Sequence, residues 1–338
     1  MEIRFVRRRM VAAVSALFLL LAACEGSTAV VSGGHVADQA AGRSSPGPPA
    51  PTGSTAGQTS DDPGGAGGAG AVGPEVYPDP FRGLGTWIDI YDVRAWRHPE
   101  RSVRAMRDRG VRTIYLQTSN FSRGRQFVHL EGVDRFLDAA PRRGITVVAW
   151  YLPGLRDLET DLKRSLAAIG RTTANGNRFG GFALDIESAV VENHEHRTRR
   201  LIGLSERLRR IAGPHYRLGA IVPSPRRLRT DRTYWPSFPY RELADMYDAF
   251  LPMTYFTYRV SGREGAAWYT SKNIRILRQE TAGLRVPIHV IGGIASHATA
   301  AETRGFVDAV RSHEVAGASY YTFPMIRSDQ WSELAVIE

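Results

Sequence analysis

The chain has 338 residues, of which 43% are hydrophobic, and a formal net charge of +10. This length and hydrophobic fraction allow a globular core of ordinary size and exclude a chain that is disordered throughout. Nearly all the cations are arginines, and they are spread through every predicted helix without the interleaved aromatic residues of a nucleic-acid-binding surface. We therefore expect a solvated basic surface and no nucleic-acid partner, with attraction to an anionic cell-envelope polymer as the alternative.

The N-terminus has the features of an export signal. Four arginines within residues 4–9 precede an apolar run from Met10 to Ala23, which is followed by the chain's one cysteine, Cys24. A run of about 14 residues is too short to span a bilayer, whereas a charged segment before a short apolar run is typical of an exported protein. With one cysteine, the exported domain has no intramolecular disulfide.

Residues 1–23, followed by Cys24 in the sequence LAAC, resemble a bacterial lipoprotein signal peptide. In that class the cysteine is lipidated through its thiol and becomes the first residue of the mature protein. The resemblance implies an anchor in the cell membrane, on its extracytoplasmic side, through a palmitate-type lipid on Cys24. A plain secretory signal with an incidental cysteine is the alternative.

Residues 24–80 form a segment rich in Gly, Ala, Ser, Pro and Thr, for example GGAGGAG from Gly64 to Gly70. Such a composition cannot bury enough apolar surface to offset the conformational entropy lost on folding. We expect a disordered tether that spaces a folded domain, residues 81–338, away from the membrane.

From Phe81 onward, short β-rich runs alternate with amphipathic helical stretches. In one of these stretches Leu201, Leu204, Leu208 and Ile211 have the spacing of a core-facing helical stripe. Eight strand–helix units in this length predict a (β/α)8 barrel, and the last helix is expected at Ser328 to Val336. A doubly wound open sheet is the alternative, but no Gly-rich phosphate loop follows the first strand. The expected strands are Gly85–Ile90, Thr113–Gln117, Thr146–Tyr151, Phe182–Ile186, Leu218–Val222, Ala249–Met253, Ile288–Ile291 and Ala318–Thr322.

The fourth predicted strand, GGFALDIES from Gly180 to Ser188, contains two carboxylates in an apolar pattern. Because side chains alternate along a strand, Asp185 and Glu187 share one face, about 6.6 Å apart along the strand. A buried parallel strand is ordinarily apolar on both faces, so we interpret the two acids as a site. Solvated or salt-bridged acids at a strand end are the alternative.

In a (β/α)8 barrel, function lies at the carboxyl ends of the strands. Polar and aromatic residues gather there, and aromatic rings around paired acids suit a sugar ring, which offers apolar faces and hydroxyl groups. The candidate substrate-binding residues are Asp89, Tyr91, Gln117, Trp150, Tyr258, Tyr320 and Tyr321.

GGFALDIE resembles the strand-four signature D-G-x-D-x-D-x-E of the chitinase-like family 18 glycoside hydrolases, and Met253-Thr254-Tyr255 resembles that family's strand-six M-x-Y motif. The resemblance implies that Glu187 protonates the glycosidic oxygen. It also implies that Asp185 orients the 2-acetamido group, which acts as the nucleophile, and that Tyr255 hydrogen-bonds this group.

The sequence departs from that pattern at several positions. Gly180 and Ala183 replace the first two aspartates, Phe256 replaces the acid after the strand-six tyrosine, and Tyr320 or Tyr321 replaces a strand-eight tryptophan. The chain also resembles the family 25 muramidases, which have D-x-E at strand four and an aspartate in strand one. Asp89 matches that aspartate.

Two further groups of residues are candidates for a site. His194-Glu195-His196 gives no metal site on a helix, because residues two apart do not face each other, so we expect no metal and no cofactor. The arginines at positions 226, 227, 229 and 232 follow the fifth strand, and they are either a solvated loop or a clamp for an anionic glycan.

Together these patterns predict a monomeric, lipid-anchored glycoside hydrolase that acts on peptidoglycan or another polysaccharide. The alternative is a sugar-binding barrel that has lost the chemistry.

Overall fold

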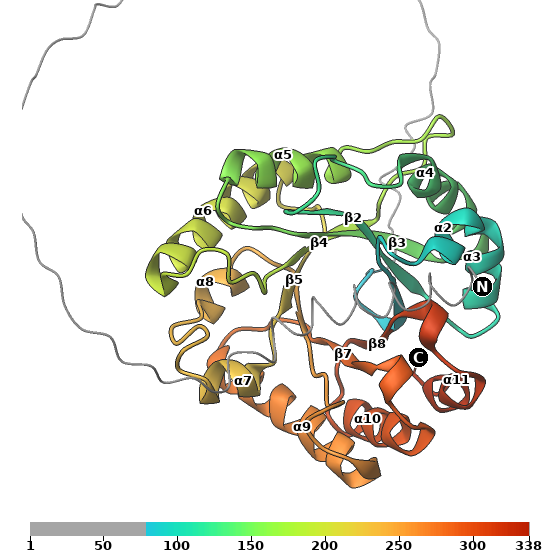
Figure 1. Cartoon of the computed structure of the whole chain (residues 1–338), viewed down its shortest axis with the longest axis vertical. Coiled ribbons are helices and arrows are strands. Elements are labelled where there is room, and N and C mark those ends of the chain that lie inside the picture. Colours follow the sequence, from blue (N-terminus) through green and yellow to red (C-terminus); the bar gives the residue numbers. More distant parts are fainter. Residues whose placement is uncertain (1–78, 338) are drawn as a thin grey trace, which may run out of the picture. The chain divides into compact units, whose positions relative to one another are not determined.

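A computed structural model of the chain describes residues 79–337. All eight strands are parallel, and they pair in the order β6-β5-β4-β3-β2-β1-β8-β7, with the helices in a ring outside them (Figure 1). The predicted (β/α)8 barrel is therefore confirmed. The strands are β1 Gly83–Ile88, β2 Thr113–Asn120, β3 Thr146–Leu152, β4 Gly181–Asp185, β5 Leu218–Val222, β6 Ala249–Pro252, β7 His289–Ile294 and β8 Gly317–Tyr321.

The barrel is closed by a narrow seam between β6 and β7. Two isolated parallel bridges, Phe250 to Ile288 and Met253 to Ile291, join these strands. Backbone hydrogen bonds from Phe250 to Pro287 (3.0 Å) and from Thr254 to Ile291 (2.8 Å) accompany them. The sheet thus curves until its two edge strands meet, and no strand edge stays open.

Ten α-helices and three short 3₁₀ turns lie between and after the strands of residues 79–337. None of these helices is long and apolar enough to cross a membrane. The helices are α2 Val93–Arg97, α3 Pro99–Arg107, α4 Leu130–Ala139, α5 Leu158–Ile169, α6 His194–Ala212, α7 Pro225–Thr230, α8 Tyr240–Ala244, α9 Gly262–Glu280, α10 Ala300–Ser312 and α11 Ser328–Leu334, and the 3₁₀ turns are η1 Pro141–Arg143, η2 Ala295–His297 and η3 Phe323–Met325.

The predicted stripe of α6 is correct in its first three positions. Leu201, Leu204 and Leu208 are buried in the layer between helices and strands. Ile211 is 54% exposed, contrary to the prediction, because it lies in the last turn of α6, one residue before the helix ends. End turns of a helix lose neighbours first, so periodicity overestimates burial there.

Alternation along β4 divides its side chains between two layers. Phe182 and Leu184 pack in the larger core between strands and helices, as does Ile186 just beyond the strand. Ala183 faces the barrel interior, where it packs in a smaller aromatic-rich core. Asp185 is two residues further on and so points to the same side as Ala183. The strand therefore directs its acidic side chain into the barrel, as the sequence pattern predicts.

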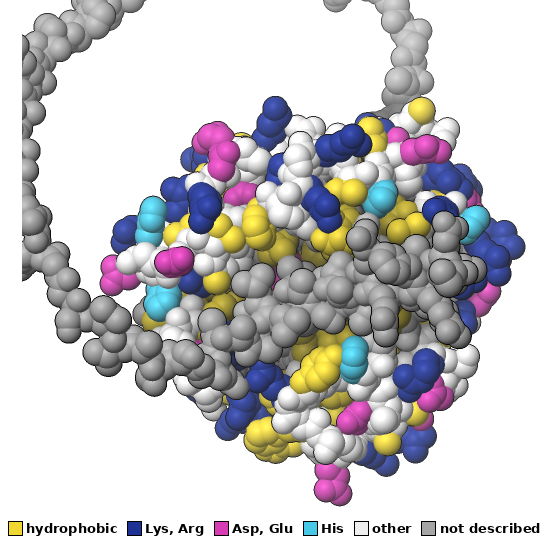
Figure 2. Space-filling model, viewed as in Figure 1, with side chains coloured by type: hydrophobic (Ala, Val, Ile, Leu, Met, Phe, Trp, Pro, Cys, Tyr) yellow, Lys and Arg dark blue, Asp and Glu magenta, His cyan; other side chains and the backbone are white. Residues whose placement is uncertain are grey.

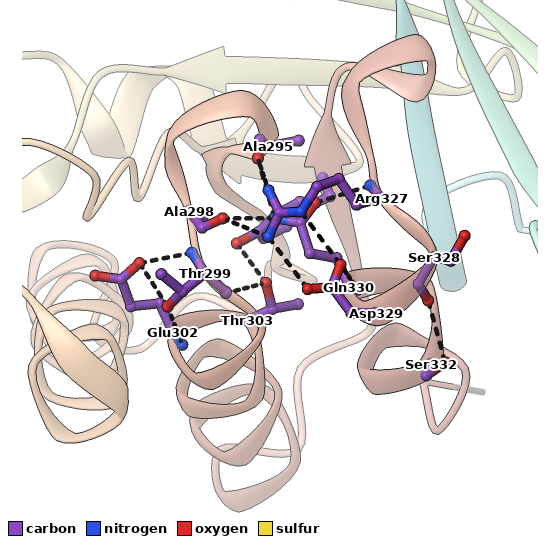
Figure 3. Close-up of polar contacts among 11 residues, drawn as sticks. Ala295, Ala298, Thr299, Glu302, Thr303, Arg327, Ser328, Asp329, Gln330 and Ser332 are labelled. Atoms are coloured by element: carbon purple, nitrogen blue, oxygen red, sulfur yellow. Dashed lines mark hydrogen bonds and ion pairs between the residues drawn. The ribbon is translucent and has the colours of Figure 1, made fainter.

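The last strand–helix unit is held by the side chains at the start of α11 (Figure 3). Gln330 is fully buried and donates from Nε2 to the carbonyl oxygens of Ala295 and Ala298, both at 3.0 Å. Its Oε1 accepts from the backbone N–H of Arg327 at 2.9 Å, and the Arg327 guanidinium also reaches the Ala298 carbonyl. These contacts fasten the loop after β7 to α11, so a seven-residue helix completes the barrel.

Gln330→Leu keeps the size of the side chain but removes three hydrogen bonds, two donated to the carbonyls of Ala295 and Ala298 and one accepted from the Arg327 N–H. Each lost bond costs about 0.5–1.5 kcal/mol. We expect the melting temperature to fall by several degrees, at about 2–4 °C per kcal/mol for a domain of this size. Ser332→Ala on the same helix is the control, because the Ser332 hydroxyl is exposed and bonds only to the Ser328 carbonyl. Equal melting temperatures for Gln330→Leu and wild type would contradict this role.

Candidate active site

The two acids of strand four lie at the carboxyl end of β4. Asp185 is the last residue of the strand and is 6% exposed, and Glu187 follows two residues later and is half-buried. The Oδ1 atom of Asp185 is buried and has no hydrogen-bond partner within residues 79–337. A buried carboxylate oxygen without a donor is rare in a structural role, so this atom is a candidate ligand contact.

Burial makes both acids weaker. Burial, followed by the negative charge of Glu187, raises the pKa of Asp185 well above its usual range. Burial also raises the pKa of Glu187 to about 7, although the positive charge of Arg227 opposes the rise. Near neutral pH the pair therefore retains a proton, as expected when two neighbouring carboxyl groups leave water together.

Aromatic side chains form the floor and walls of the barrel mouth. Trp87 stacks on Tyr115 with a centroid separation of 4.2 Å and meets Trp150 edge to face at 5.7 Å. Tyr255, just beyond β6, and Tyr321, at the end of β8, pack against this interior cluster, with their ring centroids 6.2 Å apart. Trp87, Tyr115 and Trp150 are buried and fill the interior, whereas Tyr255 and Tyr321 are half-buried and so keep ring surface on which a sugar can stack.

The Tyr255 hydroxyl is influenced by both acids. Burial, followed by the charges of Glu187 and Asp185, raises its pKa well above the usual value. Trp150 pairs in register with Ala183, one interior layer below Asp185. Its indole N–H is buried without a hydrogen-bond acceptor in residues 79–337.

A second acidic group lies on the β1 side of the mouth. Asp89 accepts the Tyr321 hydroxyl at 2.9 Å and the backbone N–H of Tyr91 at 2.7 Å, and Asp92 accepts the backbone N–H of Asp89 at 3.0 Å. Burial raises the pKa of Asp89, and burial together with the charge of Asp89 raises that of Asp92 further. Tyr321 thus links this group to Tyr255 and the acids of β4.

The other predicted substrate-binding residues have different positions. Gln117 is buried, and its Oε1 accepts the backbone N–H of Ile90 at 3.0 Å, so this side chain fixes the loop after β1. Tyr91 is half-buried on the rim, where its hydroxyl accepts from Arg123 at 2.9 Å. Tyr258 is 70% exposed and lies 4.9 Å from the ring of His297.

Tyr320 does not reach the mouth, contrary to the prediction. It is fully buried between the strands and the helices, and its hydroxyl is 3.1 Å from that of Thr303. The reason is the strand period of two, which sends Tyr320 and Tyr321 to opposite faces of β8. Of the two tyrosines, only Tyr321 faces the interior.

No sequence pattern distinguishes Tyr234, which lies in the irregular segment between α7 and α8. Its hydroxyl donates to the backbone carbonyl of Glu187 at 2.7 Å, and the guanidinium of Arg227 lies 4.1 Å above its ring. The buried Arg197 donates to the carbonyls of Tyr234 (3.1 Å) and Val191 (2.8 Å). These bonds tie the loop after β4 to the segment after β5 and so hold the backbone at Glu187.

The positions where the chain departs from the family 18 pattern are apolar in the structure as well. Ala183 lies in the interior core below Asp185, and Phe256 is buried in the outer layer against Phe306. Within residues 79–337 there is no group of three or more His, Cys, Asp or Glu side chains arranged to hold a metal ion.

Comparison with known sequences gave no match to any family model and none to a curated protein.

Comparison with solved structures gave many barrels. The endo-β-1,4-mannanase of Thermotoga petrophila aligns with a TM-score of 0.59 at 13% identity over 76% of each chain. The spore cortex-lytic enzyme SleL of Bacillus cereus aligns at 0.52 and 10% identity, over 75% of this chain and 73% of that one. A class V chitinase of Pseudomonas fluorescens aligns at 0.55 and 11% identity, over 75% and 98%. Identities this low establish the fold, and the chain is similar in fold to glycoside hydrolase barrels.

Proposed function

We propose that residues 81–338 form a glycoside hydrolase domain that acts on a cell-wall or extracellular polysaccharide. Glu187 is the general acid, Asp185 orients the 2-acetamido group of the substrate, and Tyr255 hydrogen-bonds that group. The observation that carries this proposal is the pair of buried acids at the end of β4, of which Glu187 has a pKa raised to about 7. A carboxyl group that keeps its proton near neutral pH is what a leaving glycosidic oxygen needs.

The proposed reaction uses these groups in one sequence. The Glu187 carboxyl gives its proton to the glycosidic oxygen while the bond from that oxygen to C1 breaks. In the family 18 pattern the acetamido oxygen of the substrate attacks C1 at the same time, and water later opens the cyclic intermediate. The unpartnered Oδ1 of Asp185 is an acceptor suited to the acetamido N–H, which supports a 2-acetamido sugar at this position.

A non-catalytic sugar-binding barrel is the second candidate. The observation in its favour is that Ala183 fills the interior position below Asp185, where the family 18 signature has an acid. Loss of that acid removes a group able to stabilise the charge on Asp185 during the reaction. Such a protein would retain the aromatic wall and bind glycans without cleaving them.

Replacement of the acid separates the two candidates. We expect Glu187→Gln to lower the hydrolysis rate on a cleaved glycan by a factor of about 10²–10⁴ or more, with fold and affinity retained. Wild-type activity should fall as the pH rises through about 7, because the acid then loses its proton. Incubation with peptidoglycan, chitin and α-linked glycans, followed by mass spectrometry of the products, measures both effects.

Two variants serve as comparisons in that assay. Asp185→Asn should also disable the enzyme, and Tyr255→Phe should lower the rate less, since it removes one hydroxyl group. Full activity of Glu187→Gln would assign catalysis to other acids, with Asp89 and Asp92 the next to test.

The raised pKa of Glu187 has a cost in stability. Above about pH 4.5 the unfolded chain loses this proton while the folded state retains it up to about pH 7, so stability falls as the pH rises through this window. Glutamine has no proton to lose. We therefore expect Glu187→Gln to be more stable than wild type at pH 8, by about 1–3 kcal/mol, and equally stable at pH 4. Urea unfolding at both pH values measures this, and a variant of lower stability at pH 8 would contradict a raised pKa.

We also propose that the mature protein begins at a lipidated Cys24 and is held on the extracytoplasmic side of the cell membrane by that lipid. Residues 1–78, which include the signal and nearly all of the tether, lie outside the described residues, and the proposal rests on the LAAC sequence. Wild-type cells grown with a palmitate analogue should yield a labelled protein in the membrane fraction, and Cys24→Ala should yield none. Label retained in Cys24→Ala would exclude this anchor.

A further inference from the structure

The arginines that follow β5 differ in how fully acidic side chains pair with them. Arg229 is neutralised, since its guanidinium lies 2.6 Å from Glu280 and 2.8 Å from the side-chain oxygen of Gln279. Arg227 is less fully paired: its Nε lies 3.5 Å from Asp231, one turn later in the chain. No hydrogen bond within residues 79–337 uses the two terminal nitrogens of Arg227. This residue therefore keeps donors available for another anion.

Arg227 lies near Glu187, the proposed general acid. Its guanidinium lies 4.1 Å above the ring of Tyr234, whose hydroxyl donates to the Glu187 carbonyl at 2.7 Å. The Arg227 charge also lowers the pKa of Glu187 against the effect of burial. Basic and hydrophobic side chains gather over α7 and the neighbouring part of α9 in Figure 2. Arg227 thus presents a cation to the mouth beside the general acid.

The charge of Arg227 lacks a full counter-charge when the site is ready for catalysis. Its side chain is only 19% exposed, and Glu187 must be protonated, and so neutral, to act as the acid. Asp231 is the remaining carboxylate in contact with the Arg227 guanidinium, through one nitrogen. A largely buried cation is costly to maintain without an anion, so a negatively charged substrate group would stabilise it.

We propose that Arg227 binds a carboxylate of the glycan, so that the substrate has an acidic sugar next to the bond that Glu187 acts on. This inference rests on the proposed function, since it takes Glu187 as the point where the glycan binds. The planar guanidinium suits a carboxylate because two parallel N–H groups match its two oxygens. The carboxylate has two sources in envelope glycans, the lactyl ether of muramic acid and the ring carboxyl of a uronic acid.

Binding of matched pairs of probes tests the proposal. The protein is the full-length chain in detergent, and it carries the Glu187→Gln substitution to prevent turnover. One pair is a peptide-free peptidoglycan tetrasaccharide and chitotetraose, which differ in the lactyl carboxylate. The other pair is tetragalacturonate and its carboxyl-reduced form. We expect one acidic probe to bind about 10–100 times more tightly than its neutral counterpart, as measured by calorimetry. Which pair shows the preference identifies the source of the carboxylate.

Variants of α7 assign that preference to one side chain. Adding Arg227→Gln should bring the affinity for the acidic probe to that of the neutral one, and Arg227→Lys should retain part of the difference. Adding Arg229→Gln, which removes the same charge from the same helix, should leave the ratio unchanged. Thermal melts check folding, and if Arg227→Gln does not fold, the partial loss in Arg227→Lys decides.

The outcomes separate this inference from the proposed function. Equal binding of acidic and neutral probes, no binding of either acidic probe, or equal losses in Arg227→Gln and Arg229→Gln would overturn it. If the preference for the acidic probe depends on Arg227 but the wild-type protein cleaves no glycan, the inference is supported and the proposed hydrolase function is refuted. Cleavage of a neutral glycan at a rate independent of Arg227 would support the hydrolase and refute the inference.

Discussion

The burial of two carboxyl groups on the interior face of β4 is the constraint on which the site depends. The strand period of two puts Asp185 on the same side as Ala183 and sends Leu184 to the helix layer. Loss of solvent is the largest cause of the raised pKa of both acids. An interior that was wider or more polar would ionise the pair and remove its proton. The aromatic cluster beneath the acids therefore helps to exclude water from them as well as to pack the barrel interior.

The walls of the mouth are held by bonds between neighbouring loops. Tyr234 and Arg197 join the loop after β4 to the segment after β5, so the position of Glu187 depends on residues about 50 positions away in the chain. On the other side, Asp89 accepts the Tyr321 hydroxyl and so joins the first strand to the last. Because the carboxyl ends of all eight strands face the same way, such bonds form between loops at one end of the barrel.

Much of this arrangement could be predicted from the sequence, because strands and helices have periods. All eight expected strands begin within two residues of the observed ones, and Asp185 ends β4 on the face where alternation predicts it. Periodicity has no information about Tyr234, which lies in an irregular segment. It also shows that Tyr320 and Tyr321 face opposite ways without showing which one faces inward, and this depends on the register of β8 against β1. Likewise, the contact between Arg229 and α9 joins residues far apart in the chain, so the local sequence pattern does not predict it.

The seam between β6 and β7 has a consequence for how the barrel moves. Each pair of neighbouring strands elsewhere forms a ladder of at least four residue pairs, whereas this pair is joined by isolated bridges. The last residue of β6, Pro252, also has no amide hydrogen to donate. Local opening requires breaking the fewest bonds at this line. Tyr255 follows β6 directly, so an excursion of the seam would carry this ring away from Asp185 and Glu187. The strand junction with the fewest bonds therefore borders the mouth of the barrel, so local opening there would change the mouth while the other seven junctions stay paired.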